Sequence, residues 1–175
     1  MKTARHWLDL ALGVAGMVLA ATAHAEERFL VQVPAVYDSA APVTDSVRRE
    51  CAIESVIGNH VFMQVSAAFP KSLQIQAPGK DDREKYLMLT VLAVQGVGGG
   101  AWSGGKSITI RADLLQEGKT VSTKVLSRGS RGGAFGGFSG TCQIMERIAG
   151  ALGRDTAAWL KTLAPDLGRN DGPGG

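Results

Sequence analysis

Residues 107–116 read SITIRADLLQ, and their apolar and polar side chains alternate along the chain. An extended chain places successive side chains on opposite faces, so this alternation predicts a β-strand with one buried face. The side chains expected on the buried face are Ile108, Ile110, Ala112 and Leu114. The opposite face carries Ser107, Thr109, Arg111 and Asp113 and is expected to be polar.

The segments on either side extend this strand into an antiparallel meander. Glu117 and Gly118 form a tight hairpin turn, after which Thr120–Ser127 is expected to return beside the first strand. Before it, Tyr86–Gln95 reads YLMLTVLAVQ and is apolar on both of its alternating faces. A strand of that kind belongs at the covered centre of a sheet.

A strand and a long helix are expected to precede the meander. Arg28–Tyr37 alternates like a strand in which Pro34 marks an edge or a bend. A helix capped by Thr44 or Asp45 is expected to run to about Phe69, because apolar side chains recur there with a helical period. Its expected buried stripe consists of Val47, Cys51, Ile57, Val61, Phe62 and Val65.

The remaining segments complete the predicted fold. Leu73–Gln76 fits a short strand, and a helix is expected over Cys142–Leu152, ended by Gly153, with Asp155 capping a further turn or two. The order of elements is then β-α-β-β-β-β-α. This order predicts an α+β fold, a single-domain layer sandwich with a mostly antiparallel sheet and two main helices.

Residues 1–25 have the features of a cleavable export signal. Lys2 and Arg5 give a positive start, and Leu10–Ala21 is an uncharged apolar run, shorter than the roughly 20 residues that span a bilayer. Ala23 and Ala25 supply the small residues of a signal-peptidase site, so cleavage is expected after Ala25. We therefore expect a periplasmic protein with no membrane span after signal cleavage.

The rest of the composition limits the possible functions. Residues 26–167 are enough for one domain with its own core, and the polar, glycine-rich segment 168–175 is expected to be a disordered tail. A formal net charge of +3 is too small to indicate nucleic-acid binding. Glycine is concentrated in two short segments, Gly96–Gly105 and Gly129–Gly140.

Cys51 and Cys142 are the two cysteines of the chain. In an exported protein an even pair is interpreted first as a disulfide. Two buried thiols or a redox pair are the alternatives, although a redox pair usually needs closer sequence spacing.

Residues 100–107 match the phosphate-binding loop pattern G-x-x-x-x-G-K-[ST], with Lys106 and Ser107 at its end. That loop binds nucleotides because its lysine and serine begin a helix whose N-terminus faces the phosphates. Here the following segment, Ile108–Asp113, is predicted to be a strand. We therefore expect no nucleotide to bind.

Few other residues suit catalysis or metal binding. His60 is the only histidine outside the predicted signal, which excludes a His-rich zinc site, and we expect it to have a surface or helix-cap role. Ser103 and Lys106 match the S-x-x-K pair of penicillin-recognising enzymes, but the companion motifs of those enzymes are absent. No metal and no cofactor are expected.

The meander makes one positive prediction about a binding site. It should bring both glycine-rich segments to the same end of the sheet. Their side chains would then gather on one rim, made of Trp102, Ser103, Lys106, Arg128, Arg131, Phe135 and Phe138. Aromatic rings, cations and exposed backbone amides suit an anionic or glycan ligand. The alternative is that the two segments pack against each other and the aromatic residues form a minor core.

Three motifs together suggest a family. The combination GVGGGAWSGGKS, RGSRGGAFGGFSGTC and GRDTAAWL resembles a family of exported proteobacterial proteins with no assigned activity, over residues 45–163. The resemblance implies a periplasmic, single-domain protein in which Cys51 and Cys142 form a fixed pair, and it implies no catalytic residue. The order of strands and helices is also similar to that of envelope-assembly lipoproteins such as the curli secretion lipoprotein, whose lipid-attachment motif is missing here.

These observations favour a periplasmic binding or structural module that engages an envelope protein or a cell-wall component through the rim. The alternative is an enzyme that acts on an envelope substrate with Ser103 and Lys106, together with Glu54.

Overall fold

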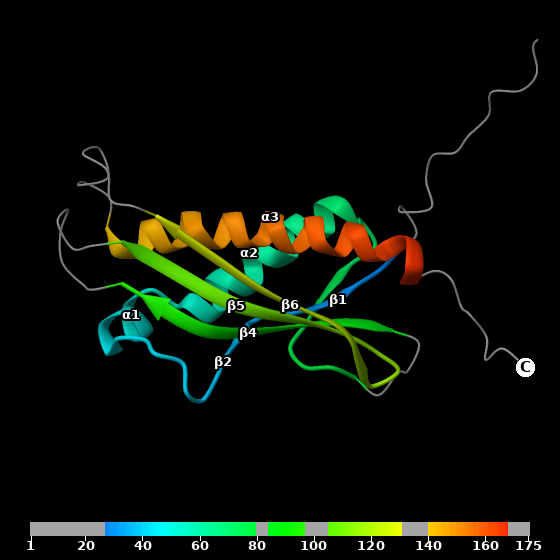
Figure 1. Cartoon of the computed structure of the whole chain (residues 1–175), viewed down its shortest axis with the longest axis horizontal. Coiled ribbons are helices and arrows are strands. Elements are labelled where there is room, and N and C mark those ends of the chain that lie inside the picture. The colour runs from blue at the N-terminus through cyan, green and yellow to red at the C-terminus, as the bar shows by residue number, and fades with distance from the viewer. Residues whose placement is uncertain (1–26, 80–83, 97–104, 131–139, 168–175) are drawn as a thin grey trace, which may run out of the picture.

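The computed structural model describes residues 27–79, 84–96, 105–130 and 140–167 (Figure 1). Within these ranges the chain has six strands and three helices, which confirms the α+β class. The strands are β1 (Leu30–Gln32), β2 (Val36–Tyr37), β3 (Leu73–Ile75), β4 (Lys85–Gln95), β5 (Lys106–Gln116) and β6 (Lys119–Ser130). The helices are α1 (Asp45–Glu50), α2 (Ile53–Ala68) and α3 (Thr141–Leu167).

The strands form one open sheet with the order β3-β1-β4-β5-β6, and β2 also pairs with β4. β4, β5 and β6 are antiparallel neighbours, as the alternation predicted, with Leu89 opposite Ala112 and Ile110 opposite Leu126. The short strands β1, β2 and β3 run parallel to their partners. The sheet is therefore mixed, but most of its paired residues belong to the antiparallel meander.

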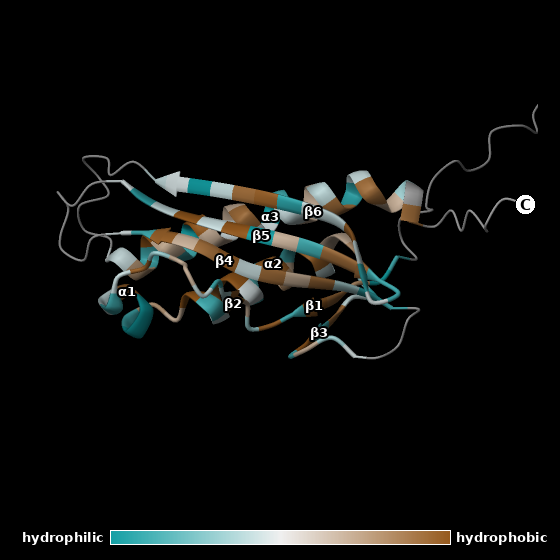
Figure 2. Cartoon of the chain, turned by 60° about the horizontal axis from the view of Figure 1, so that its bottom comes forward, coloured by the Kyte–Doolittle hydropathy of each residue, from teal (hydrophilic) through white to brown (hydrophobic). Residues whose placement is uncertain are grey.

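Helices α2 and α3 lie side by side against one face of the sheet (Figures 1 and 2). Hydrophobic and hydrophilic residues alternate along β5, so that one face of this strand can join the core (Figure 2). Its buried residues include the four apolar side chains that the sequence predicted, Ile108, Ile110, Ala112 and Leu114. The helices add Ile57, Val61, Met145, Leu152 and Leu160 to the same core.

The first long helix is interrupted where the sequence predicts a continuous one. Cys51 and Ala52 separate α1 from α2, and Ala52 has left-handed backbone angles (φ 43°, ψ 46°) that no residue inside a right-handed helix can adopt. The predicted apolar stripe nevertheless stays inward, because Val47 in α1 and Ile57 in α2 are both buried. The prediction of the buried face was right, and the prediction of an unbroken helix was wrong.

The last helix is continuous where the sequence predicts an interruption. α3 runs continuously from Thr141 to Leu167, so the prediction that Gly153 ends a helix is wrong. Gly153 is buried against α2, where an added Cβ would lie only 2.6 Å from the backbone oxygen of His60. The glycine is therefore explained by the close approach of two helices and not by helix termination.

The strand predicted over Arg28–Tyr37 is divided at Pro34 into β1 and β2. Pro34 thus marks a bend and not an edge, because β1 lies between β3 and β4. The division allows the second half to pair further along β4, with Val36 opposite Thr90.

Cys51 and Cys142 form a disulfide. The bond joins the junction between α1 and α2 to the second residue of α3. It confirms the interpretation of the cysteine pair and indicates an exported protein, because disulfides persist in oxidising compartments. In the part of the chain that the structure describes, no helix is both long and apolar enough to cross a membrane.

Candidate binding site

The candidate site lies at the end of the sheet where β4 ends, β5 begins and β6 ends. Gln95 pairs with Ser107, and Lys106 pairs with Ser130, so the residues that flank the two glycine-rich segments lie next to one another. This register confirms, for those flanking residues, that the meander brings both segments to one end. The opposite end of β5 and β6 is closed by the hairpin turn at Glu117 and Gly118.

Only two of the seven predicted rim residues fall within the described ranges. The predicted residues outside these ranges are Trp102, Ser103, Arg131, Phe135 and Phe138. The other two are in different environments, since Lys106 is 6 % exposed whereas the side chain of Arg128 is 54 % exposed.

Lys106 is the first residue of β5 and belongs to the row of side chains that faces the helices. This row continues through Ile108 and Ile110, which explains why Lys106 is buried. Its aliphatic chain lies near Gly96, close to the place where Met145 of α3 packs. Lys106 is therefore not the exposed cation that the rim prediction required, because a long lysine side chain can bury its methylene groups along apolar neighbours.

Arg128 is placed on the surface between β6 and α3, where it forms a two-pronged ion pair with Asp155. Its Nε lies 2.5 Å from Oδ2 of Asp155, and its Nη2 lies 2.7 Å from Oδ1. Paired N–H donors that meet both carboxylate oxygens give a charge-assisted contact with a fixed geometry. The hydrogen bond lowers the pKa of Asp155 and raises the pKa of Arg128, so both groups are charged at neutral pH.

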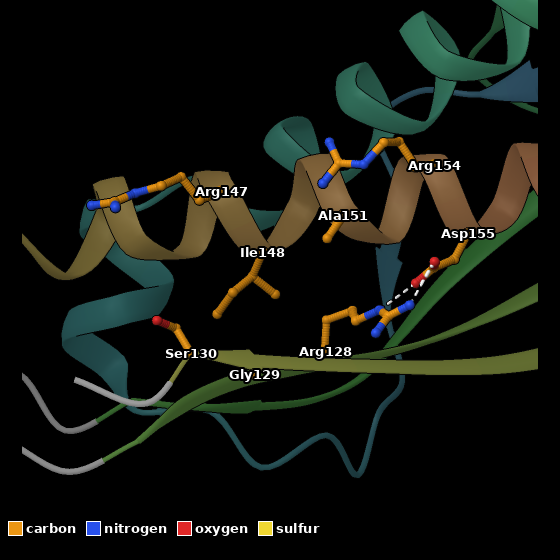
Figure 3. Close-up of a pocket in the computed structure, with 8 residues that line it drawn as sticks. All are labelled: Arg128, Gly129, Ser130, Arg147, Ile148, Ala151, Arg154 and Asp155. Carbon is orange, nitrogen blue, oxygen red and sulfur yellow. Dashed lines mark hydrogen bonds and ion pairs between the residues drawn. The ribbon is translucent and has the colours of Figure 1, made fainter. Parts of the chain in front are cut away.

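An open groove of about 460 Å³ lies beside this ion pair (Figure 3). One wall comes from the end of β6 and the other from consecutive turns of α3. The groove is lined by Arg128, Gly129, Ser130, Arg147, Ile148, Ala151, Arg154 and Asp155. Three guanidinium groups and one carboxylate make the lining positive overall, while Ile148 and Ala151 supply apolar surface between them.

Sequence reasoning missed the helical wall of this groove. Arg147, Ala151 and Arg154 follow one another at intervals of one turn, so they share a face if the helix continues through Gly153. The prediction that the helix ends at Gly153 placed Arg147 and Arg154 in different elements and gave Asp155 the role of a helix cap. The signal was present in the sequence, but it depended on the continuity of α3.

His60 does not contribute to the groove and does not have the surface or cap role that the sequence suggested. It lies where α2 crosses α3, with its side chain 23 % exposed and its Nε2 3.9 Å from Oε1 of Glu146. Its Nδ1 is buried and has no hydrogen-bond partner among the described residues. In those same ranges, no three metal-ligating side chains are grouped as a metal site would require.

No family model and no curated protein matches the chain. Solved structures with a similar arrangement include the PelC dodecamer from Paraburkholderia phytofirmans, with 16 % identity over 87 % of this chain and 94 % of that one and a TM-score of 0.49. A Xanthomonas campestris protein of the DUF330 family has 11 % identity over 83 % of this chain and 91 % of its own, with a TM-score of 0.48. A minor lipoprotein from Acinetobacter baumannii has 8 % identity over 77 % and 92 %, with a TM-score of 0.40. Likeness at this level concerns the course of the chain alone and carries no argument about a ligand or an activity.

Proposed function

We propose that the protein is a non-catalytic binding module of the cell envelope, braced by its disulfide, that engages an envelope protein or a cell-wall component with the glycine-rich end of its sheet. The observation that carries this proposal is the strand register, which places the flanks of both glycine-rich segments beside the groove between β6 and α3. A ligand at this end would meet backbone amides, aromatic rings and arginines together.

Two features support the envelope as the place of action. The Cys51–Cys142 bond is typical of an oxidising compartment, and residues 1–25 have the pattern of an export signal. We propose a periplasmic protein that is cleaved after Ala25, with one domain over residues 26–167. Mass spectrometry of the protein recovered from a periplasmic extract should identify Glu26 as its first residue.

The proposed contact surface includes Arg128 together with the rim residues that lie outside the described ranges, Trp102, Ser103, Arg131, Phe135 and Phe138. Lys106 contributes to the packing of this end and not to its exposed charge, because it is buried. That burial also gives no support to the alternative of an enzyme in which Ser103 and Lys106 act on a substrate.

Site-specific photo-cross-linking in living cells tests the proposal. A photoreactive amino acid replaces Trp102 or Phe135 at the glycine-rich end, and the matched control replaces Lys119 beside the hairpin turn at the other end. We expect discrete adducts with one envelope protein, or with purified cell-wall sacculi, from the first two positions and not from the third. Equal labelling from both ends, or no adduct from either, would contradict the proposal.

A further inference from the structure

We propose that the groove between β6 and α3 binds a phosphate group. This inference rests on the proposed binding role of the same end of the molecule and names the chemistry of its ligand. Arginines on two walls, a hydroxyl and a partly apolar floor are the observations that support it.

The arginines that line the groove belong to two opposite walls. Arg128 comes from β6, whereas Arg147 and Arg154 come from α3, seven residues and thus about 10 Å apart along the helix (Figure 3). Figure 3 shows the guanidinium groups of Arg147 and Arg154 spread along the helix, each on a long and exposed side chain. Rotation of these side chains would allow both to reach an anion held between the walls.

Asp155 holds the side chain of Arg128 in one conformation, in which it can bind such a ligand. It occupies Nε and one Nη2 proton of Arg128, which leaves three of the five guanidinium N–H donors for another partner. An arginine that is already held in one rotamer loses less conformational entropy when it binds. Asp155 is therefore a positioning residue.

The charge of the lining fits a phosphate. Asp155 is the only carboxylate among the described residues that line the groove, against three arginines. The nearby Glu146 lies on the α2 side of the helix, close to His60. Three arginines and one carboxylate make the lining positive overall, opposite in sign to the charge of about −1.5 to −2 on a phosphate monoester at neutral pH.

The shape of the groove also favours phosphate over carboxylate. One arginine can satisfy both oxygens of a carboxylate, as Arg128 does for Asp155, whereas a tetrahedral phosphate presents oxygens in several directions. Donors on two facing walls, one of which also carries the hydroxyl of Ser130, suit the second geometry. The buried side chain of Ile148 excludes water from one side and strengthens these electrostatic contacts.

The test uses the protein purified after export of the full chain. Inorganic phosphate is titrated at constant ionic strength while amide and arginine Nε–H signals are followed by NMR, with acetate titrated in parallel. We expect phosphate to shift the signals of Ser130, Ile148 and Ala151 and acetate to leave them in place. The double variant Arg147→Gln/Arg154→Gln should bind phosphate at least about tenfold more weakly.

A matched variant controls for the loss of two positive charges. Lys119→Gln/Lys124→Gln removes two exposed lysines of β6 that do not line the groove, and phosphate affinity should change by less than about twofold because exposed distant charges are screened. Equal weakening in both variants, equal shifts with acetate, or the absence of shifts at the groove would overturn the inference.

Vesicles distinguish the source of the phosphate. Flotation with phosphatidylcholine vesicles that contain phosphatidylglycerol, lost in the arginine variant and kept in the lysine variant, would identify a lipid headgroup. Phosphate binding without flotation would identify a soluble phosphate or phosphoester. If cross-links from the Trp102 position persist while phosphate fails to bind, this inference is wrong and the proposed function stands. If those cross-links are absent, the proposed function is wrong whether or not phosphate binds.

Discussion

Gly153→Ala should destabilise the protein even though alanine is the better helix former. In an unobstructed helix the change would stabilise by about 1 kcal/mol. Here the added Cβ would lie 2.6 Å from the backbone oxygen of His60, 3.0 Å from its carbonyl carbon and 3.1 Å from Cγ of Gln64. Two of these atoms belong to the backbone, so the helices themselves must separate. Overpacking of this kind costs about 3 kcal/mol at the upper end of its usual range, which leaves a net loss of about 2 kcal/mol.

Gly150→Ala is the matched control on the same helix. A Cβ there would lie 3.7 Å from Nδ1 of His60, an ordinary van der Waals distance, so this change should stabilise the protein by up to about 1 kcal/mol. Thermal and urea unfolding of the two variants should therefore give shifts of opposite sign. The loss at Gly153 should lower Tm by about 4–8 °C for a domain of this size.

Gly153→Asn separates helix crossing from helix termination. If Gly153 ended a helix in the left-handed conformation, asparagine would be tolerated better than alanine. At a helix crossing the larger side chain must be worse, so we expect a lower Tm for Gly153→Asn than for Gly153→Ala. A higher Tm for Gly153→Asn than for Gly153→Ala would refute the reasoning. Tm shifts of the same sign for Gly150→Ala and Gly153→Ala would refute it as well.

Three further predictions follow from single contacts. Replacing both Cys51 and Cys142 by alanine should lower the free energy of unfolding by up to about 4–5 kcal/mol in urea titrations, because the bond closes a loop with a sequence separation of 91. The hydrogen bond from Arg128 lowers the pKa of Asp155 below its ordinary value of 3.8. The pair therefore stabilises the fold above pH 3.8 and loses this contribution as the pH falls through the lowered pKa. The difference in Tm between the wild type and Asp155→Asn should accordingly shrink below pH 3.8. Tyr37→Phe should raise the free energy of unfolding by about 1 kcal/mol, because the Tyr37 hydroxyl is buried with no partner in the described ranges, and a lower value would indicate a partner for this hydroxyl.

The meander could be predicted from the sequence because local signals agree there. The alternation over residues 107–116, the apolar character of Tyr86–Gln95 and the turn at Glu117 and Gly118 all point to the same three strands. The turn accounts for the antiparallel pairing of β5 with β6 and for the shared end of the two glycine-rich segments, but not for the register shift between Leu114 and Leu115. The disulfide was likewise predictable from the number of cysteines and the expected compartment.

The two helix errors have a common physical cause. A helix ends or continues according to tertiary contacts that the sequence pattern does not contain. Ala52 has no turn signal, yet the chain breaks there beside a disulfide to a distant helix. Gly153 has a strong turn signal, yet α3 continues because the glycine is needed for contact with α2.

The wrong prediction that a helix ends at Gly153 explains why the groove was not predicted from the sequence. Arg147 and Arg154 share a helix face only when α3 passes through Gly153, and Asp155, which points toward β6 as Ile148 does, meets Arg128 only in that continuous helix (Figure 3). The rim prediction therefore included Arg128, which lines the groove, but not the helical residues that line its other wall.

The disulfide should hold one half of this groove more firmly than the other. Cys142 is the second residue of α3, so Arg147 and Ile148 follow it within two turns, whereas Asp155 lies about 20 Å further along the helix. Asp155 is also tied directly to β6 through Arg128. Reduction should therefore release the first turns of α3 before it affects the ion pair.

Amide hydrogen exchange can resolve these two halves. In the reduced protein, protection should fall more at residues 142–148 than at residues 152–156, since local opening needs only the contacts of the segment that opens. The Cys51→Ala/Cys142→Ala variant should show the same gradient without reductant, which excludes an effect of the reagent. A uniform fall along α3 would mean that the helix opens as one unit and that the ion pair with Arg128 gives no local support to its distal half.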